Sequence, residues 1–269
     1  MDQQLTSTQK ANLHEVADLL LEIYQTLASM RFLNPAGIIK GPHNIDSVLN
    51  LYEELGLDPS IIYLYSILPY IDCRLAGQTD FFKGGIFADF RQAEDIEQGR
   101  DPFYICPGDD DYEDEDGPYM RPWVTPLSLI GNHQSVILYD ARRHRIWIID
   151  QESWNTSDPA LGNMPDSVAG DEYECGEKSN NDNSFQHVPS RPAGDVLRDM
   201  VRWYRSLEIM PGGGENTRPE WNYDELPLRE LYSKHGWPDN FNGDAFVADQ
   251  LRHTVLIADA QRQNGEDAT

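Results

Sequence analysis

Two short apolar runs constrain the fold of this chain more than any other feature. Residues 136–139 read Val-Ile-Leu-Tyr, residues 146–149 read Ile-Trp-Ile-Ile, and the polar residues 140–145 join the two runs. Short β-branched and aromatic runs with such a connection predict a β-hairpin. Because both alternating faces of each run are apolar, we expect the hairpin to be covered on both sides. Residues 123–130 can add a third strand beside it.

The rest of the chain is predicted to pack around this meander. Apolar residues at spacings of three and four predict amphipathic helices over 7–30, 44–55, 195–207, 226–235 and 243–261. The fold class that follows is α+β, with an antiparallel meander sheet centred on residues 123–150 and helices packed around it. We expect a single domain over residues 1–269. Residues 151–194, rich in Ser, Asn, Asp, Gly and Pro, predict a polar loop or insert.

Three local signals add detail to this prediction. Ser7 or Thr8 can cap the first helix. Asp58-Pro59 predicts another helix start, and the nearly continuous apolar residues that follow predict that this segment is buried. Residues 81–90 predict a pair of strands around two consecutive glycines.

The charge of the chain excludes several classes of partner. Lys and Arg number 21 against 46 Asp and Glu, which gives a formal net charge of −25. Such a surface repels phosphate backbones and anionic lipids, so we expect neither nucleic-acid nor membrane binding. A protein partner, for which a basic surface would be complementary, fits the charge better.

The termini and cysteines predict a compartment. The N-terminus has no apolar signal core, and no run of the sequence is long enough to span a membrane. The three cysteines are odd in number and far apart, as is typical of a reducing compartment. The expected location is the cytoplasm or the nucleus.

No motif in the sequence predicts a metal or a cofactor. The acidic run 109–116 resembles a calcium loop in composition only, because aligning the following Gly117 with the EF-hand pattern places Tyr112 and Trp123 at ligand positions. A solvated surface loop is the simpler interpretation of this run. CxxC pairs, phosphate-binding glycine motifs and HExxH are missing from the sequence.

One arrangement suggests an enzyme as the alternative. His133 precedes one predicted strand and Asp150 ends the next, which is the hairpin placement of the catalytic pair in papain-type proteases of ubiquitin-like proteins. A cysteine-dependent hydrolase would also need a thiolate beside the imidazole. Cys73 is the best of the three cysteines for that role, because Cys106 and Cys175 lie in acidic, polar segments.

The chain also resembles a known superfamily. Trp123 and Pro126, then Gly131, the runs ending at Asp140 and Asp150, and the later segment DVLRDMVRWYRSL are similar to the SUKH superfamily over about residues 46–212. That superfamily includes fungal cell-wall-synthesis regulators and bacterial toxin-immunity proteins. Gly131-Asn132 departs from the family's Gly-Asp turn, and the polar insert before the last helix is unusual.

The resemblance implies a non-enzymatic protein-interaction or regulatory module and carries over no catalytic residues. Candidate binding residues are then the polar and aromatic side chains around the ends of the predicted strands, namely Trp123, Asn132, His133, Asp140 and Asp150.

Overall fold

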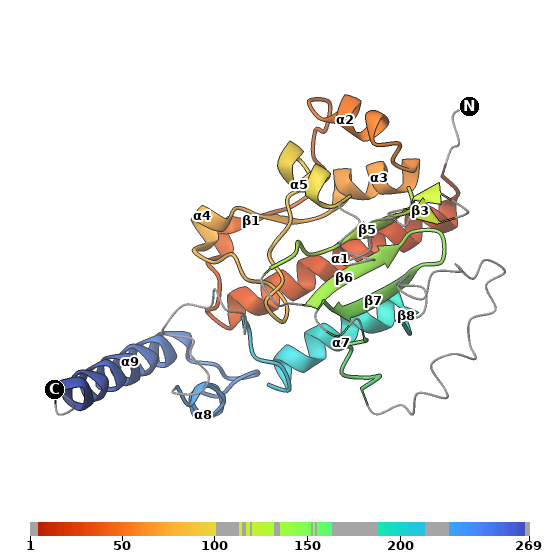
Figure 1. The fold of residues 1–269 in the computed structure, drawn as a ribbon. Helices are drawn as coiled ribbons and strands as arrows, with labels where there is room; N and C mark the ends of the chain where they lie inside the picture. The colour runs from red at the N-terminus through yellow and green to blue at the C-terminus, as the bar shows by residue number, and fades with distance from the viewer. Residues whose placement is uncertain are drawn as a thin grey trace.

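A computed structural model defines the fold (Figure 1). It describes residues 5–100, 113–114, 117–118, 120–131, 135–151, 153, 155–162, 188–212 and 226–266, without the side chains of 113–118 and 259–266. The helices are α1 (Ser7–Ser29), the 3₁₀ turn η1 (Pro35–Gly37), α2 (Leu49–Glu54), α3 (Pro59–Ile67), α4 (Cys73–Ala76), α5 (Ala93–Gln98), α7 (Ala193–Arg205), α8 (Leu228–Lys234) and α9 (Gly243–Glu266). The strands are β1 (Ile38–Ile39), β2 (Tyr70–Ile71), β3 (Glu113–Asp114), β4 (Gly117–Pro118), β5 (Val124–Pro126), β6 (Ser135–Asp140), β7 (Arg145–Asp150) and β8 (Arg191–Pro192).

The central sheet confirms the α+β class and the predicted meander. Its four antiparallel strands lie in the order β5-β6-β7-β8, and β6 pairs with β7 from Ser135 opposite Asp150 to Asp140 opposite Arg145. The predicted third strand is β5, which is shorter than expected. The short hairpins β1-β2 and β3-β4 lie outside this sheet.

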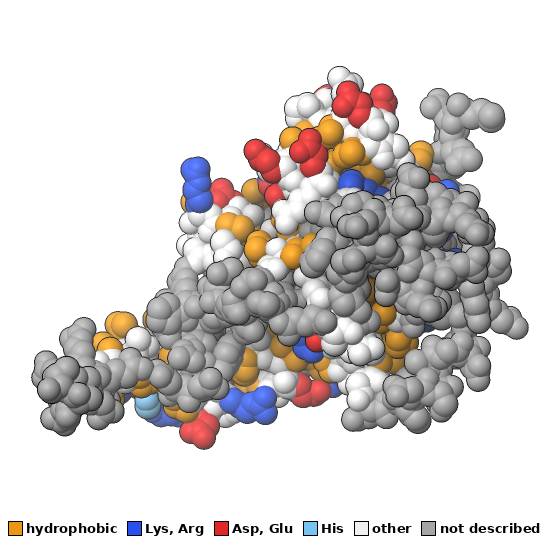
Figure 2. Space-filling view, in the orientation of Figure 1, with side chains coloured by type: hydrophobic (Ala, Val, Ile, Leu, Met, Phe, Trp, Pro, Cys, Tyr) orange, Lys and Arg blue, Asp and Glu red, His pale blue; other side chains and the backbone are white. Residues whose placement is uncertain are grey.

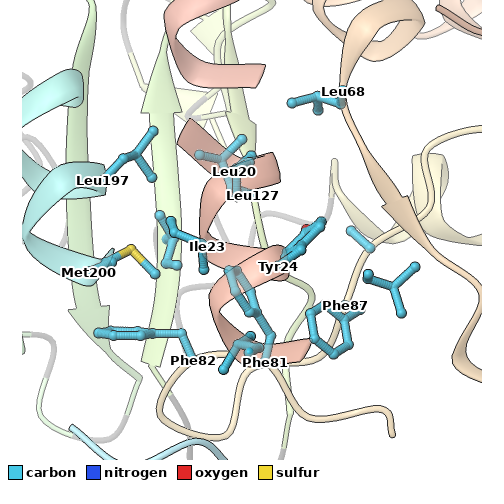
Figure 3. Packing of buried hydrophobic residues seen from close by; sticks show 14 of the residues in the cluster. Leu20, Ile23, Tyr24, Leu68, Phe81, Phe82, Phe87, Leu127, Leu197 and Met200 are labelled. Atoms are coloured by element: carbon cyan, nitrogen blue, oxygen red, sulfur yellow. The ribbon is translucent and has the colours of Figure 1, made fainter. Parts of the chain in front are cut away.

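One face of the sheet carries the main core. Ile137, Tyr139, Ile146 and Ile148 are buried there against α1 and α7. Figure 3 shows Leu197 and Met200 of α7 on one side of Leu20 and Ile23 of α1, with the aromatic side chains of Phe81, Phe82 and Phe87 at one end of the cluster. These aromatic contacts include Tyr24, whose ring meets Phe81 and Phe87 edge-on at 5.4 Å. The amphipathic spacing of α1 is thus explained by core packing.

The opposite face of the sheet is also covered, as the sequence predicted. Val136, Leu138, Trp147 and Ile149 form a second apolar cluster with a few neighbouring residues. The indole nitrogen of Trp147 donates a hydrogen bond of 2.8 Å to the backbone oxygen of Val188. Val188 therefore belongs to this cluster.

Strand β8 and helix α7 correct the predicted end of the polar insert. Residues 151–194 are not polar loop to their end, because β8 joins the sheet at Arg191 and α7 begins at Ala193. Arg191 and Pro192 carry no apolar pattern, so a strand of only two residues could not be predicted there. Residues 163–187 of the predicted insert lie outside the described residues.

Several helix boundaries also differ from the prediction. Thr6 caps α1, instead of Ser7 or Thr8, in a reciprocal capping box with Gln9. The helix predicted over 44–55 is the shorter α2. Asp58 caps α3 as expected and accepts a hydrogen bond from the Ser60 amide at 3.0 Å.

Residues 81–90 do not form the predicted strand pair. They make isolated bridges, of which Ile86 opposite Leu129 attaches the segment to the chain leading into β6. Lys83 and Gly84 form a turn there, which the Gly85 amide closes by donating to the Phe82 carbonyl, and the phenylalanines enter the core. Of the acidic run 109–116, only residues 113–114 are described, and they form β3 instead of a loop.

The C-terminal helix α9 extends away from the body (Figure 1). Its predicted apolar face is divided, because Phe246 is buried against α8 whereas Val247, Leu251 and Val255 are exposed. Asp249 anchors the first turns of α9, and hydrogen bonds from Lys234 and His235 lower its pKa to about 2. Among the described residues, no helix combines the length and apolar character that crossing a membrane would require.

Replacement of Ile148 by Asp tests whether the hairpin is the centre of the fold. Ile148 is 1% exposed, so the new carboxylate would be buried without a partner. We expect a loss of at least about 4 kcal/mol in the free energy of unfolding, measured by chemical denaturation. The control Leu251→Asp, at a position 64% exposed, should change it by less than about 0.5 kcal/mol. Equal effects of the two substitutions would contradict this account.

Candidate functional site

A groove lies at the surface between α1 and α3. It consists of two adjacent hollows of about 520 and 470 Å³, and the side chains of Tyr63 and Ser66 line both. We call it the α1–α3 groove. The first hollow is lined in addition by Leu5, Lys10, Ile45, Pro59 and Ile62. The second is lined, among others, by His14, Leu21, Lys40, Pro42, Ile67 and Pro69.

The groove exists because α3 is apolar on more than one face. Ile61, Leu64 and Tyr65 point into the core, as expected for a buried segment. Ile62 and Tyr63 lie on the other side of the helix and are only half-buried, so the prediction that the whole segment is buried is wrong for them. A helix placed against a core can bury only part of its circumference, which leaves these two side chains at the surface.

Polar contacts hold Tyr63 in position between the hollows. Its hydroxyl is hydrogen-bonded to Nε2 of His14 at 2.9 Å. The ammonium group of Lys10 lies 5.6 Å from the centre of the Tyr63 ring, within range of a cation–π interaction. Both partners are on α1, so the long N-terminal helix fixes a side chain that α3 supplies.

The residues predicted as a binding site divide into separate groups. Trp123 is half-buried, and the guanidinium of Arg142 stacks 3.4 Å from the centre of its ring. Arg142 also forms an ion pair of 3.1 Å with Asp58. Burial alone would raise the pKa of Asp58, but hydrogen bonds from Ser60 and Arg142 leave it lower than usual. The Trp123 ring is thus linked, through Arg142, to the N-cap residue of α3.

Asp140 has a structural role in the hairpin turn. It is 2% exposed, and one carboxylate oxygen accepts hydrogen bonds from the backbone amides of Arg142 and Arg143 at 2.8 and 2.9 Å. Burial raises its pKa although these amides oppose the shift. Asp140 therefore shapes the turn from inside and does not offer a surface for a ligand.

Asp150 ends β7 at the other end of the hairpin. It accepts a hydrogen bond from the Ser153 hydroxyl at 3.1 Å and pairs with Ser135 across the sheet. Asn132 and His133, which were predicted to lie near it, fall outside the described residues.

The environment of Cys73 does not suit a nucleophile. Cys73 is the first residue of the four-residue helix α4, and burial, together with the carboxylates of Asp95, Asp72 and Asp89, raises the pKa of its thiol. A raised pKa disfavours the thiolate that the hydrolase alternative requires. Within the described residues, no histidine forms a hydrogen bond with this thiol. Cys106 and Cys175 are not described.

A polar network on the other side of α1 connects it to the hairpin turn. Nε2 of His144 lies 2.7 Å from a carboxylate oxygen of Glu15, and Nδ1 of His144 is 3.1 Å from the hydroxyl of Tyr139. Arg198 of α7 pairs with the other oxygen of Glu15. The hydrogen bond with His144 lowers the pKa of Glu15, partial burial opposes this, and the charge of Arg198 adds to it. The network joins three elements that meet around the core.

Comparisons with known proteins do not assign the site. No protein-family model matches the chain, and neither a curated protein nor a solved structure matches it significantly. Among the described side chains, no cluster of three or more His, Cys, Asp or Glu could hold a metal ion.

Sequence reasoning missed the groove for a specific reason. Its central contact joins His14 and Tyr63, which are 49 positions apart, and no motif connects them. The available signal was on α1, where Lys10 and His14 follow each other at a spacing of four, away from the apolar face. On α3, the signal was Tyr63, which lies outside the spacing of the buried residues Ile61, Leu64 and Tyr65.

Substitutions at Asp140 should distinguish its acceptor role from its charge. Asp140→Ala leaves two amides without an acceptor, and we expect a loss of about 1–3 kcal/mol in the free energy of unfolding at neutral pH. Asp140→Asn retains an acceptor and removes a buried charge with a raised pKa, so its stability should equal or exceed that of the parent. Similar losses for both substitutions, measured by chemical denaturation, would show that the charge itself is needed.

The lowered pKa of Glu15 predicts a pH-dependent contribution to stability. A carboxyl with a depressed folded-state pKa stabilises the fold above its ordinary value of 4.5, and this stabilisation is lost as the pH falls through the folded-state value. Glu15→Gln should therefore be less stable than the parent at neutral pH, by up to about 1 kcal/mol. The difference should disappear on acidification below pH 4.5. Glu22→Gln, an exposed control on the same helix, should show no such trend.

Proposed function

We propose that this chain is an intracellular, non-enzymatic protein-interaction or regulatory module of the SUKH type, and that the α1–α3 groove is its binding surface. The observation that carries the proposal is the pair of hollows on either side of Tyr63. Apolar hollows with a few fixed polar groups are typical of binding sites. Tyrosine is also enriched among the side chains that dominate interface energies.

The environment of Cys73 supports binding over catalysis, because burial and the charges of three carboxylates raise the pKa of its thiol. The candidate binding residues Asp140 and Trp123 are already engaged, one in the turn and the other by Arg142, so the binding surface is placed elsewhere. The groove, in contrast, presents side chains that the described elements around it leave partly exposed. Ten of its sixteen lining residues lie on α1 and α3, and the others, among them Lys40, lie on adjoining segments. The two helices give most of the surface a rigid support that needs little ordering on binding.

A second surface fits the predicted basic partner. Figure 2 shows Asp and Glu side chains gathered over α2 and α5. The exposed carboxylates on these helices include Glu53, Glu54, Glu94 and Glu97. Such a surface is complementary to a basic partner and raises the rate of encounter with it. This acidic surface would act in addition to the groove, where apolar contacts would supply most of the affinity.

The proposal predicts that a partner can be crosslinked from the groove. A photoreactive phenylalanine analogue at Ile62 should form a discrete protein adduct in extract of the source cells, whereas the same analogue at the exposed position Arg229 of α8 should not. The purified partner should bind the parent and lose affinity at least about tenfold for Tyr63→Ala, because a central aromatic contact is removed. Calorimetric titration measures this loss, and unchanged melting confirms that the variant is folded.

The hydrolase alternative is tested in the same preparation with an activity-based thiol probe. Under the proposal, labelling of cysteines is slow and is the same in His133→Ala. Rapid labelling of one cysteine that depends on His133 would contradict the non-enzymatic assignment.

A further inference from the structure

The α1–α3 groove carries positively charged side chains, whereas the molecule as a whole is strongly acidic. The chain carries a net charge of −25 and has only five lysines, yet Lys10 and Lys40 both line the groove. Both lysines are exposed, and neither forms an ion pair within the described residues. Asp18 is the one carboxylate among the described lining residues, and it lies on the second hollow. The groove is thus cationic on an acidic surface.

This reversal constrains the ligand. Among the described residues, the ammonium group of Lys10 contacts the ring of Tyr63 and no carboxylate, so a carboxylate arriving at the groove could pair with it without displacing a described acid. His14, which is exposed and bonded to Tyr63, adds a further donor beside the second hollow. Basic side chains entering the groove would instead meet two lysines. Unlike the surface of α2 and α5, the groove therefore favours acidic groups.

The apolar lining constrains the ligand further. Leu5, Ile45 and Ile62 line the first hollow, whereas Leu21 and Ile67 line the second. Each hollow is large enough for bulky apolar side chains, and Tyr63 stands between them. Two apolar sites in a row with cations beside them match a linear chain that carries apolar and acidic residues together. Nucleic acids and anionic membranes match less well, because the net charge of the protein repels an extended polyanion.

We propose that the α1–α3 groove binds an acidic linear peptide of a partner protein, with apolar side chains in the two hollows and carboxylates paired with Lys10 and Lys40. This inference rests on the proposed function, which names the groove as the binding surface, and it adds the chemical class of the ligand. The affinity comes mainly from apolar burial on either side of Tyr63, and the lysines select for acidic sequences.

Selection from a random short-peptide library displayed on phage tests this inference. The full chain is the bait, and peptides that also bind Tyr63→Ala are removed. Enriched peptides should combine acidic residues with bulky apolar ones. As synthetic, fluorescently labelled peptides, they should bind Lys10→Glu/Lys40→Glu at least about tenfold more weakly than the parent, because carboxylates then face carboxylates. Their affinity for the parent should fall with added salt.

The matched control is Arg74→Glu/Arg229→Glu. It changes the net charge by the same amount at exposed sites on α4 and α8, outside the groove, and should leave the affinity within about twofold of the parent. An equal loss in both double variants would show a general charge effect and overturn the inference. Melting curves establish that all variants are folded.

The outcomes separate this inference from the proposed function. Groove-dependent peptides that are basic or uncharged would overturn the acidic ligand and leave the groove as a protein-binding surface. If no enriched peptide depends on Tyr63, the ligand class and the groove as the binding surface both fail. Acidic, apolar peptides that depend on Tyr63 and on the two lysines support both.

Discussion

The burial of both faces of the β6-β7 hairpin is the constraint on which the rest of the structure depends. Each fully buried aliphatic side chain stabilises the fold by about 1.5–3 kcal/mol, but only if something covers it. On one face α1 and α7 provide the cover, and on the other face Met120, Val188 and the partly buried Ile130 pack against the apolar side chains. The helices are therefore held in place by the sheet, and the position of the groove follows from theirs.

The helix α1 connects the core to the surface at which we place binding. Successive helical residues point about 100° apart, so neighbouring side chains face different partners. Glu15 points to the hairpin turn and α7, whereas His14 points to Tyr63 on α3. The same helix buries Leu20 and Ile23 in the core. A rigid core element thus positions Tyr63, and the groove needs little rearrangement to receive a ligand.

Under the proposed function, two surfaces of opposite charge would discriminate between partners. The carboxylates over α2 and α5 and the lysines of the α1–α3 groove lie on different elements. A partner that is basic in one region and acidic in a linear segment could contact both surfaces. Linking two such contacts raises the overall affinity without requiring either to be strong.

The sequence by itself determined the hairpin, its two-sided burial, the long first helix and the start of α3. Each of these rests on local periodicity or on a local cap, such as Asp58 before Pro59. The sequence also located Asp140 at the turn. It predicted a binding role for this residue, whereas in the structure Asp140 accepts a hydrogen bond from the Arg142 amide and shapes the turn. Only the tertiary structure decided that β8 completes the sheet, that residues 81–90 enter the core as a bridged loop, and that Lys10, His14 and Tyr63 share one groove. These features depend on contacts between residues far apart in the chain, which periodicity does not encode.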